Sequence, residues 1–152
     1  MKYVDGYVLP VPKKNLKAYA RMAQKAGKVW REHGALDYKE CAGDDQNVKF
    51  GVPFPRQMDI KPGEKVVFAY IVFKSRAHRD RVNAKVMKDP RLQSMRDPNN
   101  MPFDVKRMVY GGFKTLVDVG PASAPGRGAR RPAREPKRNG HAEMTEPQPA
   151  AQ

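Results

Sequence analysis

The sequence predicts an α+β domain in which a four-stranded antiparallel sheet carries two helices on one face. Two stretches place apolar residues at helical spacing, and four are rich in the β-branched and aromatic residues typical of strands. Their order along the chain is β-α-β-β-α-β, which is the ferredoxin-like pattern. We therefore expect one domain over residues 1–118, a length sufficient for a single core.

The first strand and the first helix occupy the N-terminal quarter. Residues 3–9 are predicted as a strand that Pro10 and Pro12 end. An amphipathic helix follows to about residue 31, and Gly34 is a typical stop signal after it. Its predicted apolar face consists of Leu16, Tyr19, Ala20, Ala23, Gly27 and Trp30. Trp30 is interpreted as a core anchor on that face.

A second strand and a long loop come next. Residues 35–42 are predicted as a strand with Tyr38 and Glu40 pointing to the same side. The following stretch, 44–63, contains three prolines and is longer than most loops in a compact domain. We expect it to pack as an arm over another surface or to carry function.

The second half repeats the strand-helix-strand order. Residues 64–74 are the strongest predicted strand, and Ser75 is placed to cap a helix over 76–88. A short helical turn is predicted within 91–100, and the last strand over 107–117. Gly111 and Gly112 within that strand indicate a bulge or a close backbone approach.

The strongest strand is apolar on both of its faces, which predicts a second subunit. One face carries Val67, Ala69, Ile71 and Phe73, and the other carries Val66, Phe68, Tyr70 and Val72. Right-handed crossovers place both helices on one side of the sheet, so the other side lacks cover. Monomers rarely expose so large an apolar patch, and a symmetric homodimer of two sheets face to face would cover it. The alternative is that the 44–63 loop covers this face, although it would shield a smaller area.

Residues 119–152 differ in composition from the rest of the chain. This segment is rich in Pro, Gly and Arg without apolar periodicity, and is predicted to be a disordered tail. The chain has a net charge of +14, of which the tail carries +3 and the domain +11. Such a charge attracts nucleic acid, acidic lipid or a small anion, or it is simply the solvated surface of a protein from a basic proteome.

Several function classes lack support in the sequence. Cys41 is the single cysteine, so no intrachain disulfide forms, and we interpret it as a buried strand thiol. The three histidines and Cys41 lack metal-ligand spacing, there is no phosphate-binding loop or nucleophile elbow, and no cofactor is implied. The absence of a signal-peptide pattern and of any run long enough to cross a bilayer predicts a cytosolic protein without membrane association.

Several short motifs together resemble a known bacterial family. They read YVDGY, HGAL, SRAHRD, NAKVM, DPR, MPFD, KRM and YGGF in chain order. With these motifs, residues 1–118 are similar to the YbaA-like family. The resemblance implies a dimeric α+β barrel but no particular activity. The wider fold group includes cofactor-free monooxygenases, haem-degrading enzymes and ligand-sensing domains, and the fold does not choose among them.

A small-molecule pocket is the first candidate site. If the strand faces that carry the tyrosines line the dimeric barrel, they form a mostly apolar pocket with a few polar groups. The candidate pocket residues are Tyr7, Tyr70, His78, Arg107 and Tyr110. The alternative is an interface core in which the hydroxyls find ordinary partners.

Arginines near the last strand are the second candidate site. Arg76 and Arg79, with Arg107 and Asp104, form either an anion clamp or ordinary ion pairs. The leading hypothesis is thus a homodimer that binds a small anionic or aromatic molecule, as a sensor or a cofactor-independent enzyme. The alternatives are an RNA-associated protein, binding weakly and non-specifically through its charge and its Arg/Gly-rich tail, and a purely structural dimer.

Overall fold

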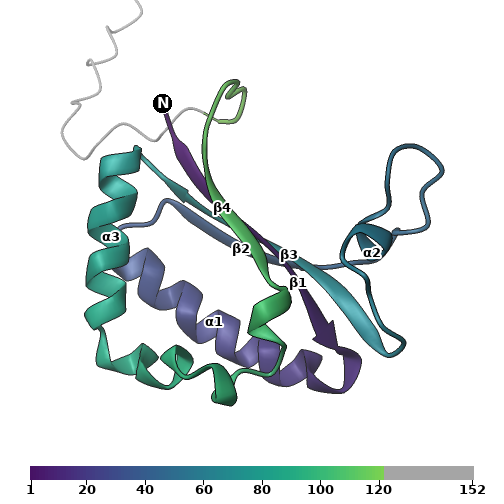
Figure 1. The fold of residues 1–152 in the computed structure, drawn as a ribbon. Coiled ribbons are helices and arrows are strands. Elements are labelled where there is room, and N and C mark those ends of the chain that lie inside the picture. The colour runs from purple at the N-terminus through teal and green to yellow at the C-terminus, as the bar shows by residue number, and fades with distance from the viewer. Residues whose placement is uncertain (122–152) are drawn as a thin grey trace, which may run out of the picture. The chain divides into compact units, whose positions relative to one another are not determined.

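The computed structural model describes residues 1–121, in which four antiparallel strands form one open sheet. The strands are β1 (Tyr3–Pro12), β2 (Asp37–Ala42), β3 (Glu64–Phe73) and β4 (Val109–Lys114), and their order across the sheet is β2-β3-β1-β4 (Figure 1). The predicted α+β class is confirmed at this level. Within Met1–Asp118 the sheet and its helices form one unit.

The two long helices lie on the same side of the sheet. They are α1 (Leu16–Glu32), which follows a 3₁₀ turn, and α3 (Arg76–Lys88) (Figure 1). The predicted cap of α3 is confirmed, because the Ser75 hydroxyl accepts the His78 N–H at 3.1 Å. A short helix that the sequence did not predict, α2 (Phe54–Gln57), lies on the opposite side, in the connection between β2 and β3.

The connection from α3 to β4 consists of three 3₁₀ segments. They are η2 (Pro90–Arg96), η3 (Pro98–Asn100) and η4 (Val105–Arg107). Asp89, Asp97 and Asp104 each accept a backbone N–H two residues further along, which begins each segment. This connection runs along the helix side of the sheet, where it completes a wall beside α1 (Figure 1).

The pairing register decides which residues face the helices. Tyr7 of β1 pairs with Ala69 of β3 and with Tyr110 of β4, so these three share the helix-covered face. Gly6 pairs with Tyr70, so Tyr70 belongs to the opposite face. We call the first side the covered face and the second side the open face.

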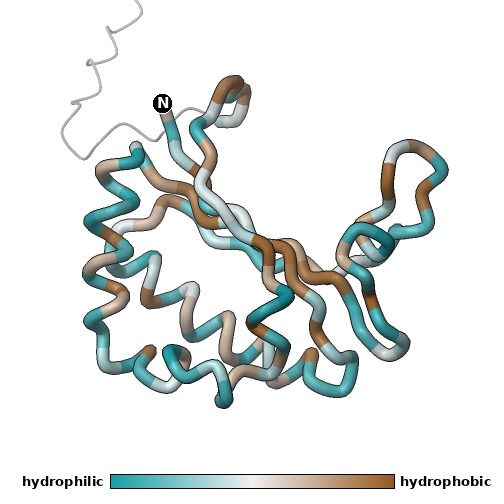
Figure 2. Tube along the Cα trace, viewed as in Figure 1, coloured by the Kyte–Doolittle hydropathy of each residue, from teal (hydrophilic) through white to brown (hydrophobic). Residues whose placement is uncertain are grey.

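The hydrophobic core fills the space between the covered face and the helices. Val67, Ala69, Ile71 and Phe73 of β3 are all buried there, as one of the two predicted faces requires. One core cluster gathers around α1 and α3, and a second around the other end of α1; Tyr7 packs against both. Figure 2 shows the apolar residues concentrated along the strands and the polar ones on the outer sides of the helices.

The open face is only partly covered within the described chain. Val66 is buried, and the ring of Phe54 from α2 lies 6.4 Å from that of Phe68. Phe68 is still 43% exposed at this end, and Val109 and Phe113 of β4 are 59% and 61% exposed. The predicted arm therefore covers one end of the open face and leaves its middle bare.

Several predicted details are wrong. Strand β1 continues through Pro10 and Pro12 instead of ending there, because β4 pairs with β1 only as far as Val8 and leaves one side of β1 without a partner strand. Ala20 is exposed, and the buried face of α1 instead includes Ala26 and Val29.

Three further predictions need correction at the strands. Cys41 is exposed on the open face and is not a buried thiol. Strand β4 is shorter than predicted. Its two glycines do not form a bulge, because the pairing with β1 is continuous. A Cβ at Gly112 would instead lie 2.8 Å from Arg79 Nη2, which is the close approach that the sequence offered as the alternative.

The two remaining predictions concern the C-terminal tail and membrane association. The predicted tail lies outside the described residues from residue 122 onward. Among residues 1–121, no helix combines the length and the apolar character needed to cross a bilayer.

Candidate functional site

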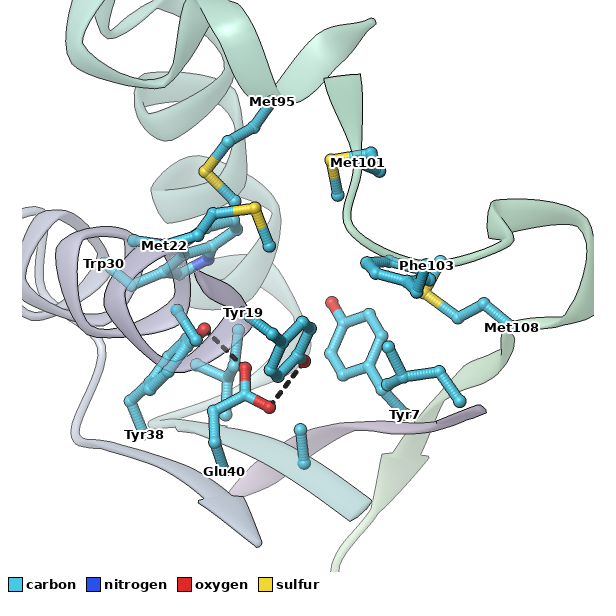
Figure 3. Close-up of a pocket in the computed structure, with 15 residues that line it drawn as sticks. Tyr7, Tyr19, Met22, Trp30, Tyr38, Glu40, Met95, Met101, Phe103 and Met108 are labelled. Carbon is cyan, nitrogen blue, oxygen red and sulfur yellow. Dashed lines mark hydrogen bonds between the residues drawn. The ribbon is translucent and has the colours of Figure 1, made fainter. Parts of the chain in front are cut away.

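A cavity of about 130 Å³ lies between the covered face, helix α1 and the 95–108 segment (Figure 3). Most of its lining is aromatic or sulfur-containing. The labelled wall residues are Tyr7, Tyr19, Met22, Trp30, Tyr38, Glu40, Met95, Met101, Phe103 and Met108. Small residues complete the wall, including Ala23 and Ala26 of α1 and Ala69 of β3. Their lack of bulk is what leaves the space between the two core clusters open.

Glu40 of β2 is the single charged side chain among the described residues that line this cavity. The Tyr19 hydroxyl donates to Oε2 at 2.7 Å, and the Tyr38 hydroxyl donates to Oε1 at 2.8 Å (Figure 3). Burial raises the pKa of Glu40 above its ordinary value of 4.5, and the two hydroxyl donors oppose that rise only in part. The site thus holds one carboxyl group in apolar surroundings.

The two tyrosines that contact Glu40 are held as donors by their surroundings. Burial, followed by the nearby carboxyl group, raises the pKa of both Tyr19 and Tyr38, so both keep their protons. Gly27 lets α1 approach the Tyr38 ring, because a Cβ at this position would lie 2.6 Å from Tyr38 Cδ1. The close helix–strand contact therefore fixes the ring whose hydroxyl reaches Glu40.

Tyr7 presents a third hydroxyl group to the cavity. Its ring stacks on Tyr110, with centroids 5.8 Å apart and planes inclined by 12°. Burial raises the pKa of Tyr7, so it too stays protonated. Figure 3 shows its hydroxyl directed into the cavity, where no described residue forms a hydrogen bond with it. This group is available to a bound molecule.

Three methionines form the boundary between the cavity and an outer groove. Met22, Met95 and Met101 line the cavity and also a shallow groove that includes Ser94 and Asn100. Methionine has three rotatable bonds and adapts its shape easily. These side chains can therefore change the shape of the boundary by rotation about their own bonds.

Glu40 also borders a second groove, on the opposite side from the methionines. Tyr38 and Glu40 line it together with Gln24, Lys28 and Arg31 of α1. The guanidinium of Arg31 donates to the carbonyl oxygen of Ala35 at 2.7 Å, so this group is held at the C-terminal end of α1. The carboxyl group of Glu40 thus lies between an apolar interior and a polar surface groove.

The structure brings together only part of the predicted pocket set. Tyr7 lines the cavity, and the ring of Tyr110 stacks on the ring of Tyr7 at the edge of the sheet. Tyr70 lies on the open face, away from both. His78 Nδ1 accepts the Lys74 N–H at 3.0 Å beside the Phe73 ring, and Arg107 donates to Glu64 at 2.7 Å. Neither His78 nor Arg107 lines the cavity.

The two predicted anion-binding arginines have separate environments. The Arg79 guanidinium lies 4.9 Å from the Tyr3 ring centroid and donates to the Tyr3 hydroxyl at 3.1 Å. Its Nε is 3.4 Å from Oδ1 of Asp5, a carboxylate that is only 5% exposed. Arg76 is exposed on the surface of α3. This geometry makes Arg79 a tether between α3 and β1.

Sequence reasoning missed the residue at the centre of the cavity. Glu40 was placed on the same strand side as Tyr38, and a carboxyl group among apolar neighbours was the available signal. The methionines of the 95–108 segment gave no comparable signal, because nothing in their spacing indicates a common wall. Within residues 1–121, no group of three or more His, Cys, Asp or Glu side chains is arranged to hold a metal ion.

The fold and the site define an α+β protein with a partly open, mainly apolar cavity that contains one carboxyl group. Residues 2–105 match the family described as "Protein of unknown function (DUF1428)", and the chain belongs to this family. The resemblance found in the sequence motifs is thereby confirmed.

Two bacterial relatives show the same similarity. "Uncharacterized protein YbaA" of Escherichia coli strain K12 is 42% identical over 118 residues, which are 78% of this chain and 99% of the relative. The protein of the same name from Shigella flexneri matches with the same values. Among solved structures, the de novo designed protein Foldit4 covers 78% of this chain and 100% of its own, with a TM-score of 0.39 and 8% identity. A similarity this low supports no inference.

Proposed function

We propose that the protein is a homodimer in which each subunit binds one small, mainly apolar molecule in the cavity beside Glu40. The observation that carries this proposal is a space of about 130 Å³ with aromatic and methionine walls and a single carboxyl group. Small-molecule sites have this composition of apolar walls and a few placed polar groups. An apolar cavity of about 150 Å³ admits benzene, so a single ring is the appropriate size.

A packing defect is the competing explanation, and Glu40 argues against it. Protein interiors are close-packed, and few voids exceed the size of a water molecule. A buried carboxyl group costs free energy unless it is well partnered, and an apolar residue would be cheaper at a purely structural position. A cavity and a carboxyl group in the same place are typical of a functional site.

The cavity supports an aromatic ligand more than an anionic one. The rings of Tyr7, Trp30 and Phe103 offer stacking surfaces. No Lys, Arg or His side chain of the described residues lines the cavity. A carboxylate or phosphate ligand would therefore meet Glu40 without a compensating cation.

The open face supports the homodimer. The strand order β2-β3-β1-β4, with both long helices on one side, is consistent with the ferredoxin-like sheet and the dimeric barrel expected from the sequence. Phe68 of β3 and Val109 and Phe113 of the edge strand β4 give the open face exposed apolar side chains. Burying one such side chain is worth about 1.5–3 kcal/mol, so a second sheet packed against them gains several such contributions before association costs.

The arm supplies further apolar surface near the same face. Val48, Phe50 and Val52 alternate along it, and Phe50 is 96% exposed. In Figure 1 the arm projects from the sheet on the side of α2, opposite the long helices. We infer that the arm also contacts the second subunit in the dimer.

Catalysis by proton transfer is a second candidate function. The raised pKa of Glu40 brings it closer to neutral pH, where a carboxyl group exchanges protons more readily with a bound molecule. The hydroxyl of Tyr7 would donate to a ligand oxygen. The test is deuterium uptake from heavy water at the carbon next to the carbonyl of cyclohexanone. Uptake catalysed by the wild-type protein but not by Glu40→Gln supports this candidate, and equal uptake in both rejects it.

Ligand binding itself is tested by thermal shift with toluene and benzyl alcohol. A ligand that binds only the folded state raises its melting temperature. We expect both probes to stabilise the wild-type protein and to have no effect on Ala23→Leu, which fills part of the cavity from α1. Ala84→Leu, an exposed alanine on α3, is the matched control and should respond like the wild-type protein. Equal responses of Ala23→Leu and Ala84→Leu would place binding elsewhere.

The RNA hypothesis rests on composition alone. The domain charge of +11 and the Arg/Gly-rich tail favour it, and the tail lies outside the described residues. It predicts retention of nucleic acid that falls steeply with salt and weakens when residues 120–152 are removed. No retention at low salt would reject it.

A further inference from the structure

We propose that the cavity selects a small organic cation, namely a primary amine on a single aromatic ring, whose ammonium group pairs with Glu40. This proposal rests on the proposed function, because it requires that the cavity binds a ligand. It specifies the chemical class of that ligand, which neither the family nor the relatives indicate.

The charges around the cavity give the first argument. Glu40 is the single charged group in the described lining, although the domain as a whole carries a charge of +11. A buried carboxylate without a counter-charge is strongly disfavoured, and a cation of the ligand would supply it. The two surface cations of the second groove, Lys28 and Arg31, are not in the cavity wall, so they do not neutralise its interior.

The hydrogen-bonding capacity of Glu40 gives the second argument. A carboxylate has two oxygens with about four acceptor positions in all. Tyr19 occupies one position on Oε2, and Tyr38 occupies one on Oε1. Each oxygen therefore retains capacity for one more donor. An ammonium group brings three N–H donors and a positive charge, which makes it the complementary partner.

The aromatic walls give the third argument. Trp30 and Tyr38 lie 6.2 Å apart between ring centroids, and Tyr19 and Phe103 form an edge-to-face pair at 5.7 Å. Tyr38 and Tyr19 belong to these two pairs and also contact Glu40. Ring faces attract cations, and cages of aromatic rings recognise alkylated ammonium groups. The carboxyl group thus lies where two aromatic pairs meet.

The experiment compares four probes of similar shape by calorimetric titration of the full chain at pH 7. They are benzylamine, benzyl alcohol, toluene and benzoate, which differ in charge and hydrogen-bonding group on one ring. We expect benzylamine to bind at least tenfold more tightly than benzyl alcohol, and benzoate to show no binding. In Glu40→Gln the tenfold preference disappears while benzyl alcohol binds within about threefold of its wild-type affinity, because Gln keeps the shape without the charge. One tyrosine hydroxyl can still donate to the Gln oxygen, and the other can turn to accept from the Gln NH2 group.

Two controls separate the causes. Glu32→Gln removes an exposed carboxylate at the end of α1, outside the cavity, and should keep the full preference for benzylamine. The second control uses the wild-type protein, in case Glu40→Gln does not fold. The cation needs the carboxylate form of Glu40, so benzylamine affinity should fall as the pH is lowered through the raised pKa of Glu40, while benzyl alcohol affinity stays nearly constant.

The groups that face Glu40 and bear on this pH dependence are few. They are the hydroxyls of Tyr19 and Tyr38, and the cations Lys28 and Arg31 of the second groove. Burial and the nearby carboxyl group raise the pKa of both Tyr19 and Tyr38, so both stay protonated over the range in which Glu40 titrates.

The outcomes distinguish this inference from the proposed function. If toluene and benzyl alcohol bind but benzylamine has no advantage over benzyl alcohol, the cation inference is overturned and the binding cavity stands. If none of the four probes binds, both fail. A preference for benzylamine that survives in Glu40→Gln also overturns the inference, because its source would then lie outside the cavity carboxyl group.

Discussion

The two faces of the sheet differ in the kind of free space beside them: one borders a cavity and the other is an exposed surface. On the covered face, β3 contributes Val67, Ala69 and Ile71, each at most 5% exposed, and the remaining free space is a partly open cavity beneath α1. On the open face, Phe68 and Phe113 are 43% and 61% exposed, and the free space is a surface. A concave apolar cavity suits a small molecule and an exposed apolar surface suits a second protein surface.

Strand β2 shows how sharply the two faces are separated. Tyr38 and Glu40 point to the covered face and take part in the cavity, whereas Lys39 and Cys41 between and beside them point to the open face. Neighbouring residues of a strand lie on opposite sides of the sheet. Substitutions on one face should therefore affect ligand binding or dimer formation separately.

The largest expected effect is on the open face. Phe113→Arg places a charge on the open face, in the proposed interface. We expect the dimer dissociation constant to rise about 100-fold or more, since burying an unpaired charge costs several kcal/mol. Analytical ultracentrifugation measures it. Met87→Arg is the matched control, because Met87 is a 55% exposed residue on α3, and it should leave the dimer unchanged. A wild-type protein that stays monomeric at micromolar concentration contradicts the proposed interface.

A pair of identical substitutions tests the covered face. Tyr19→Phe removes a donor from the buried Glu40 carboxyl group and should lower the free energy of unfolding by about 1.5–3 kcal/mol. Tyr7→Phe removes a hydroxyl that has no hydrogen bond to the described residues, and should change it by less than about 0.5 kcal/mol. Urea unfolding measures both. If both variants lost the same free energy of unfolding, the Tyr7 hydroxyl would have a hydrogen-bond partner that stabilises the fold, contrary to this account.

The pH dependence of stability tests the state of Glu40. Its folded pKa lies above the unfolded value of 4.5, so the folded state binds more protons than the unfolded state between these two pKa values. The free energy of unfolding should therefore fall as the pH rises through that window. Glu40→Gln lacks this titration, so its stability relative to the wild-type protein should rise from pH 4 to pH 7. A difference that is constant with pH would show that Glu40 does not titrate in this range.

The smallest expected effect concerns Cys41. It is exposed in the single chain but lies on the open face, so the proposed dimer should slow its alkylation by iodoacetamide several-fold relative to Phe113→Arg. Mass spectrometry follows the reaction. Equal rates in the wild-type protein and in Phe113→Arg would indicate that any dimer leaves this part of the open face uncovered.

The order of the elements could be predicted from the sequence because it depends on local patterns. Helix α3 begins after Ser75 and ends at Lys88 as expected, since a cap and the following proline determine both ends locally. The two apolar faces of β3 were also visible, and one of them is buried as predicted. These features require no knowledge of which strand pairs with which.

The site could not be predicted to the same extent because it depends on register. Tyr7 and Tyr70 were expected in one pocket, but Tyr7 pairs with Ala69 and Tyr70 with Gly6, so the two tyrosines point to opposite sides. A shift of one residue would reverse this result, and no local pattern determines it. The contact of Glu40 with Tyr19 joins β2 to α1 across the core, which a single sequence does not reveal.

The most direct measurement is an NMR titration of protein labelled at its methionine methyl groups. Four methionines, Met22, Met95, Met101 and Met108, line the cavity, whereas Met58 and Met87 do not. On addition of benzyl alcohol, we predict that the signals of the four cavity methionines shift together and that those of Met58 and Met87 stay in place. Shifts confined to Met58 or Met87, or no shift at any methionine, would contradict a ligand site beneath α1.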